Sequence, residues 1–187
     1  MKILNLPNTL TIIRAILIPI ILIGAYSDKT IVLSFTLVLL ILAWLLDFLD
    51  GHIARKFDLI TPFGTFFDPL VDKVLMLSLF FVFVDLELIP IWMALLFMVR
   101  EFLVSGVRQL GSLKGKIVGA NWMGKTKWNL QVIIVIFTLS FLLAKSYNYT
   151  IPFGREIIYF GTFIIVLLSY IFTFIFFGWN RELFVEK

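Results

Sequence analysis

Residues 41–56 read ILAWLLDFLDGHIARK, and residues 62–84 read PFGTFFDPLVDKVLMLSLFFVFV. Each stretch belongs to an apolar run long enough to cross a bilayer as a helix. Together they nevertheless contain four aspartates, at positions 47, 50, 68 and 72. A charged side chain inside a bilayer costs several kcal/mol, so it persists only where it is paired, binds a metal or faces water. These two stretches therefore predict a membrane fold with a polar site in it.

The composition supports a membrane location for the rest of the chain. Its 187 residues are 61% hydrophobic and 15% charged, whereas soluble domains are about half apolar and a quarter charged. The absence of cysteine excludes disulfides, zinc–thiolate sites and thiol nucleophiles. The formal net charge of +4 fits cytoplasmic loops beside anionic lipid. We therefore expect a lipid bilayer, and no nucleic acid, among the partners.

Six apolar segments of about 20 residues predict an all-α polytopic protein with six transmembrane helices. Their approximate ranges are 9–26, 31–56, 66–84, 90–112, 124–144 and 153–178, with a break at Thr61–Gly64 after the second. A short interfacial segment at residues 5–11 precedes the first helix, with Asn8 and Thr9 as candidate caps. Since no linker is long enough to separate a second domain, residues 1–187 are expected to form one domain.

The distribution of basic residues predicts the orientation in the membrane. Six spans place both termini on one side, and only three of the 16 Lys and Arg residues, Lys29, Lys145 and Arg155, fall in the loops opposite. Cytoplasmic loops carry an excess of Lys and Arg. We therefore expect a multi-pass protein of the cell membrane, with the termini and the acidic site on the cytoplasmic side.

The four aspartates are spaced so that each pair lies on one face of its helix. With about 100° per residue, one face of the first helix carries two acids and two small residues, which are Asp47, Asp50, Gly51 and Ala54. On the next helix, Gly64, Asp68 and Asp72 fall within about 80° of one another. A tight turn makes the two helices antiparallel neighbours, so we expect their acidic faces to converge.

Converging carboxylates predict a metal site. Four of them in a small volume cannot all stay ionised without cations, and hard oxygen ligands favour Mg²⁺, Mn²⁺ or Ca²⁺. Two such ions about 4 Å apart would polarise a phosphoryl group. Gly51 and Ala54 would let a nucleotide lie against the helix, with Arg55 available for a phosphate. The alternative is that the acids are helix-end charges paired with Arg55, Lys56 and Lys73.

The whole pattern resembles the signature of the CDP-alcohol phosphatidyltransferases, and no position departs from it. Its fixed positions are Asp47-x2-Asp50-Gly51-x2-Ala54-Arg55-x8-Gly64-x3-Asp68-x3-Asp72. The resemblance implies that the first three aspartates bind two divalent cations, Mg²⁺ or Mn²⁺. It implies that Asp72 contacts the second metal and acts as general base on the acceptor hydroxyl. It also implies a homodimer and a CDP pocket lined by Gly51, Ala54, Arg55 and Gly64.

Two further segments bear on the acceptor. Residues 99–128 and the opening residues 6–14 resemble bacterial phosphatidylglycerophosphate synthases. On the predicted fourth helix, Glu101, Ser105 and Arg108 share a face. The cations Arg108, Lys125 and Lys127 would seat an anionic acceptor such as glycerol 3-phosphate. The candidate substrate contacts near the amino terminus are Asn8, Thr11 and Arg14.

These observations predict that glycerol 3-phosphate attacks the lipid-side phosphorus of CDP-diacylglycerol and that CMP leaves. One alternative keeps this chemistry and uses serine, inositol phosphate or phosphatidylglycerol as the acceptor. Another is a divalent-cation transporter, although such sites usually lie near the bilayer midplane on broken helices. Residues 119–126 also match the P-loop expression G-x-x-x-x-G-K-[ST], but the chain offers no strand to support a P-loop.

Overall fold

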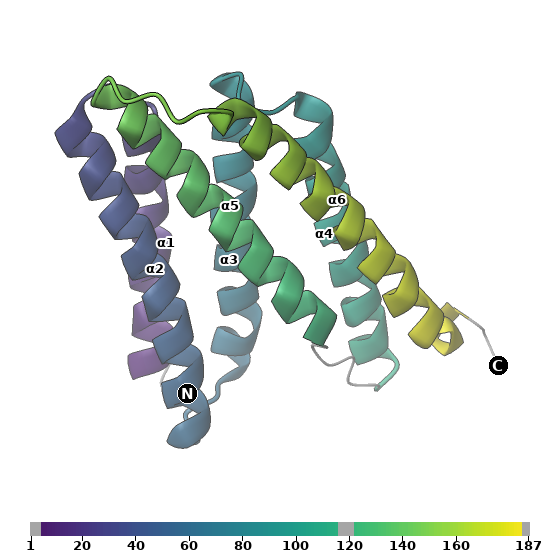
Figure 1. Cartoon of the computed structure of the whole chain (residues 1–187). Helices are drawn as coiled ribbons and strands as arrows, with labels where there is room; N and C mark the ends of the chain where they lie inside the picture. The colour runs from purple at the N-terminus through teal and green to yellow at the C-terminus, as the bar shows by residue number, and fades with distance from the viewer. Residues whose placement is uncertain (1–4, 116–121, 185–187) are drawn as a thin grey trace. The chain divides into compact units, whose positions relative to one another are not determined.

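The computed structural model describes residues 5–115 and 122–184, without the side chains of residues 55, 123 and 125. This part of the chain is all-helical, as predicted, and contains no strand. The helices follow one another along the chain in Figure 1. They are α1 (Leu6–Ala25), α2 (Thr30–Lys56), α3 (Pro62–Asp85), α4 (Ile91–Leu113), α5 (Trp122–Ser146), α6 (Gly154–Trp179) and the short 3₁₀ helix η1 (Arg181–Phe184).

Two predicted boundaries were wrong, and in both cases the helix begins earlier than expected. Helix α1 starts at Leu6, where the side chain of Asn5 accepts a hydrogen bond from the backbone N–H of Asn8. Asn5 is therefore the cap, and residues 5–11 are not a separate interfacial segment. Helix α3 starts at Pro62, and the hydroxyl of Thr61 accepts from the N–H of Gly64 at 3.0 Å. Proline suits a first helical position because its missing N–H would have no helical partner there.

Four helices, α1, α2, α5 and α6, are long and apolar enough to cross a membrane. Helices α3 and α4 have a similar length of 24 and 23 residues. Their charged residues set them apart, because α3 carries Asp68, Asp72 and Lys73 near its start and α4 carries Arg100, Glu101 and Arg108. The apolar helices identify a membrane protein, and crossing by all six helices stays a prediction.

The helices pack into two compact units. The first contains α1, α2, α3 as far as Val82 and α5 from Val135 onward. The second contains the end of α3, α4, α5 as far as Ile134, α6 and η1. All four predicted metal ligands belong to the first unit, whereas Arg108 and Lys127 belong to the second.

In the first unit, α1 and α2 run side by side in opposite directions (Figure 1). The two helices approach closely at Gly24, where an added Cβ would lie 2.0 Å from the hydroxyl oxygen of Thr36. That hydroxyl is buried and donates to the carbonyl of Val32 at 2.8 Å, so it has a fixed orientation. Small residues allow this close approach of helix backbones in membranes.

Gly24→Ala is therefore expected to destabilise the protein by about 1–3 kcal/mol, because the helices must separate or Thr36 must rotate. The measurement is the thermal unfolding midpoint of the purified protein in detergent. Gly106→Ala is the matched control, since nothing lies within 4 Å of a Cβ at Gly106. Alanine is favoured over glycine inside a helix by about 1 kcal/mol, so this control should be neutral or stabilising. Equal effects of the two substitutions would contradict the packing account.

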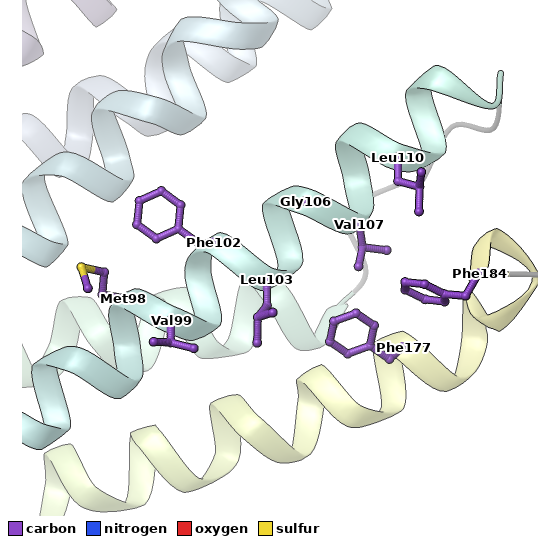
Figure 2. Close-up of a pocket in the computed structure, with 9 residues that line it drawn as sticks. All are labelled: Met98, Val99, Phe102, Leu103, Gly106, Val107, Leu110, Phe177 and Phe184. Carbon is purple, nitrogen blue, oxygen red and sulfur yellow. The ribbon is translucent and has the colours of Figure 1, made fainter.

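In the second unit, α4 and α6 run in the same direction, as their successive contacts show. Trp92 meets Phe163 near the start of both helices, the hydroxyl of Tyr170 donates to the carbonyl of Leu96 further along, and Lys114 donates to the carbonyl of Leu183 at the end. An apolar groove of about 510 Å³ lies beside this pair, and Figure 2 shows its side chains. Its lining residues are Met98, Val99, Phe102, Leu103, Gly106, Val107, Leu110, Phe177 and Phe184. This lining suits hydrocarbon rather than a phosphate or nucleotide.

Candidate functional site

The acidic faces of α2 and α3 converge in the first unit, as the helix geometry predicts. Asp47, Asp50 and Asp68 each offer a carboxylate oxygen, and these oxygens lie within 4.8 Å of one another. Asp50 is the most enclosed of the three, with 3% of its surface exposed. Asp72 lies one helical turn beyond Asp68 and joins the group through a shared ion-pair partner.

That shared partner is Arg14 of α1. Its Nη1 atom bonds to Asp47 and lies 2.9 Å from an oxygen of Asp72. Its Nη2 atom bonds to Asp68 and lies 3.5 Å from an oxygen of Asp50. With 1% of its surface exposed, Arg14 is enclosed by the acids it pairs with. The cation that pairs with the acids here comes from a third helix, and the side chain of Arg55, one of the basic residues in the alternative pairing, lies outside the described residues.

The donor chemistry of this cluster fits a divalent cation. When all five groups are ionised, four carboxylates and one guanidinium leave a formal net charge of −3. Such an excess of buried negative charge is stabilised by further cations. Carboxylate oxygens from neighbouring helices are the ligands that Mg²⁺ and Mn²⁺ prefer. Asp47, Asp50 and Asp68 thus form a cluster that could hold a metal ion.

The three candidate substrate contacts on α1 are all buried and bonded within the protein. The hydroxyl of Thr11 lies 3.2 Å from an oxygen of Asp50, which places it at the edge of the acidic cluster. The side-chain amide of Asn8 donates to the hydroxyl of Thr61 at 3.0 Å. Nearby, the amide of Asn5 donates to the carbonyl of Leu59 at 2.8 Å. These two asparagines hold the start of α1 against residues 57–61, the segment that leads into α3.

The predicted CDP-binding residues have different surroundings. Gly51 and Ala54 follow Asp50 on α2 and are partly exposed. The side chain of Arg55 lies outside the described residues. At Gly64, an added Cβ would lie 2.5 Å from the side-chain oxygen of Asn8. Gly64 therefore has a packing role, because it lets α1 approach the first turn of α3.

Lys127, one of the predicted acceptor-binding residues, lies in a polar network of the second unit. Glu101 accepts from Arg100 at 2.9 Å and is also bonded by Lys127. Arg100 in turn donates to the hydroxyl of Thr173 at 2.9 Å, which connects α4 to α6. Lys127 is buried and reaches Glu101 from α5. Its positive charge is therefore already partnered within the protein.

Arg108 differs from its basic neighbours. Its Nε atom is buried and has no hydrogen-bond partner among the residues that the structure describes. Buried donors are normally paired, so this one is suited to an anionic ligand. Arg108 lies two turns after Glu101 on α4, on the predicted shared face. Lys125, the third predicted cation, has a side chain outside the described residues.

Sequence reasoning placed Arg14 among the candidate substrate contacts and missed its pairing with the acids. The signal was a single arginine within an apolar helix, which requires a buried partner. The Glu101–Lys127 pair was also missed, although a buried acid on α4 similarly requires a cation.

Comparison with known proteins shows which family the chain belongs to. The family model of the CDP-alcohol phosphatidyltransferases matches residues 4–175. A CDP-diacylglycerol–glycerol-3-phosphate 3-phosphatidyltransferase of Rickettsia felis is 35% identical over 170 residues, which cover 89% of this chain and 92% of the relative. An enzyme of the same name from Bacillus subtilis is 38% identical over 70% of this chain and 74% of the relative. Another from Haemophilus influenzae is 32% identical over 78% of this chain and 78% of the relative. The chain belongs to the CDP-alcohol phosphatidyltransferase family.

Proposed function

We propose that this protein transfers the phosphatidyl group of CDP-diacylglycerol to glycerol 3-phosphate, giving phosphatidylglycerophosphate and CMP. Family membership and the names of the relatives support this reaction. The observation that carries the chemistry is the convergence of aspartates from α2 and α3 on one small volume. Phosphoryl transfer depends mainly on positioning and on stabilising phosphate charge, and an acidic cluster of this kind serves both when it holds cations.

The four aspartates are proposed to hold two divalent cations, Mg²⁺ or Mn²⁺. When bound, such ions polarise the phosphoryl group and neutralise the charge of the leaving phosphate. Asp72 is the proposed general base that accepts the proton of the acceptor hydroxyl. Gly51, Ala54, Arg55 and Gly64 are proposed to line the CDP pocket, and Thr11 and Arg14 to contact substrate. Because the chain has no cysteine, a thiol-linked intermediate is excluded.

The second unit is proposed to bind the phosphate of the acceptor through Arg108, Lys125 and Lys127. The Nε atom of Arg108, which has no hydrogen-bond partner among the described residues, supports this role most directly. Lys127 contributes to a network in which one acid, Glu101, contacts two cations, so the group retains a positive charge. A site of this charge favours glycerol 3-phosphate over a cationic acceptor such as choline.

Arg108→Gln is expected to raise the KM for glycerol 3-phosphate by about 10- to 100-fold, with a smaller effect on kcat. A hydrogen bond to a charged group contributes about 1.5–3 kcal/mol, and every 1.4 kcal/mol is a factor of ten in affinity. Initial rates of CMP release over a range of acceptor concentrations measure this change. The matched control is Arg155→Gln at the start of α6, where the side chain is exposed. An unchanged KM in Arg108→Gln would remove Arg108 from the acceptor site.

Three features of the assembly complete the proposal. All six helices cross the cell membrane, the termini and the acidic cluster lie on the cytoplasmic side, and two chains form a homodimer. The parallel course of α4 and α6 within the second unit supports alternating crossings. The excess of basic residues in the loops on the side of the termini supports the orientation.

The test is an acceptor panel with purified protein in detergent, CDP-diacylglycerol and Mg²⁺. Glycerol 3-phosphate should give rapid CMP release and a phosphatidylglycerophosphate product. Serine, inositol phosphate and phosphatidylglycerol should give little more than the rate without acceptor. Faster release with one of these three would assign a different acceptor to the same chemistry. No CMP release with any acceptor would instead favour a divalent-cation transporter.

A further inference from the structure

Arg14 occupies a distinctive position in the acidic cluster, because one guanidinium contacts all four aspartates. Both of its terminal nitrogens are engaged, and the group is almost completely enclosed. Its Nε atom is buried and has no hydrogen-bond partner among the described residues. The side chain is therefore held by the carboxylates themselves rather than by a separate set of neutral acceptors.

Arg14 contacts one oxygen of each aspartate, and a metal would have to bind the same carboxylates. An oxygen that accepts a short charge-assisted hydrogen bond from a guanidinium directs lone-pair density at that donor. A divalent cation needs this density for itself, and it would also repel a guanidinium only a few ångströms away. The contacts of Arg14 with Asp47 and Asp68 therefore disfavour a divalent cation bound at the same carboxylates.

We propose that Arg14 is a resident counter-ion that competes with divalent cations for the four aspartates. It compensates the carboxylates when metal is absent, and it leaves them as metal binds. This inference rests on the proposed metal site and goes beyond it. It states that displacement of one residue of α1 reduces the free energy of metal binding. This ion-pair arrangement keeps the four carboxylates close together when no metal is bound, and it lowers their apparent affinity for metal.

An ordinary structural ion pair would behave differently when Arg14 is removed. If Arg14 only held the acids in place, Arg14→Gln would lower both the stability of the metal-free protein and its metal affinity. If Arg14 competes with metal, the two quantities change in opposite directions. The metal-free protein becomes less stable because carboxylate repulsion is uncompensated, and the metal binds more tightly because no cation must be displaced.

The experiment measures Mn²⁺ binding to chelator-treated protein in detergent, by the electron paramagnetic resonance signal of free Mn²⁺. Arg14→Gln is expected to bind Mn²⁺ about tenfold more tightly than the unmodified protein. Arg14→Lys keeps the positive charge and should bind Mn²⁺ less tightly than Arg14→Gln, because a cation must still be displaced from the acids. Arg155→Gln, the matched control, removes one exposed positive charge elsewhere and should bind unchanged. In thermal unfolding without metal, Arg14→Gln should have a lower midpoint than the unmodified protein. Addition of Mn²⁺ should reduce the difference between the two midpoints.

The outcomes separate this inference from the proposed function. Equal or weaker Mn²⁺ binding by Arg14→Gln would overturn the competition, while binding by the unmodified protein would leave the metal site standing. Absence of binding by both proteins would overturn the metal site and the inference together.

If Arg14→Gln does not fold, the unmodified protein still gives an answer. Its ¹⁵N arginine resonances, assigned with Arg14→Lys, should show the Arg14 guanidinium signal shifting as Mg²⁺ is added, and an unchanged signal would overturn the proposal.

Discussion

Asp72→Asn is expected to lower the rate of CMP release by about 10²–10⁴-fold, the range that general base catalysis contributes. An amide has nearly the shape of a carboxylate but cannot accept the proton of the acceptor hydroxyl. Asp47, Asp50 and Asp68 already form a three-carboxylate cluster without Asp72, so the variant should still bind divalent cations. Steady-state CMP release and Mn²⁺ binding, measured on the same preparation, report the two properties separately.

Asp58→Asn is the matched control, because it makes the same chemical change in the same unit. Asp58 is exposed in the segment between α2 and α3, with a φ of 52° that asparagine readily adopts. This variant should retain full activity. Unchanged turnover in Asp72→Asn would refute the role of Asp72 as the base. Loss of both turnover and Mn²⁺ binding would instead show that Asp72 is needed as a metal ligand.

Removal of divalent cations by EDTA is expected to reduce CMP release by about 10³-fold or more. Metal ions contribute several kcal/mol by stabilising charge in phosphoryl transfer, and each 1.36 kcal/mol is a factor of ten in rate. Arg14 supplies one positive charge against four carboxylates. It therefore cannot neutralise both the acids and the phosphates of a bound nucleotide.

Addition of excess Mg²⁺ or Mn²⁺ should restore activity after chelation. The protein should remain folded in EDTA, because the guanidinium of Arg14 bridges the acids when metal is absent. A thermal unfolding scan in EDTA checks this point and distinguishes loss of metal from loss of structure. Full activity in EDTA would show that the aspartates act without metal and would refute the two-cation proposal.

The sequence was sufficient to predict the helices and the acidic faces, for a simple physical reason. Apolar runs of spanning length are strong signals, and the angular spacing of Asp47 and Asp50 or of Asp68 and Asp72 depends only on helix geometry. A short connection between α2 and α3 then leaves few ways to pair the two faces. The convergence of three of these acids follows from these local features.

Contacts between helices distant in sequence were harder to predict from the sequence. Helix-face reasoning takes one helix at a time, so it could not show that Arg14 of α1 lies among acids of α2 and α3. It also gave Lys127 as an acceptor-binding cation without showing that Glu101 of α4 pairs with it. The helix starts were misjudged because several adjacent polar residues can serve as caps, and tertiary contacts at Asn5 and Thr61 determine which of them does.

The two asparagine bonds at the start of α1 have a practical consequence for protein engineering. Asn5 and Asn8 hydrogen-bond to residues 59 and 61 of the loop before α3. Helix α3 carries Asp68 and Asp72. Substitution of Asn5 or Asn8 would loosen this attachment without touching the aspartates, so engineered variants should keep both residues.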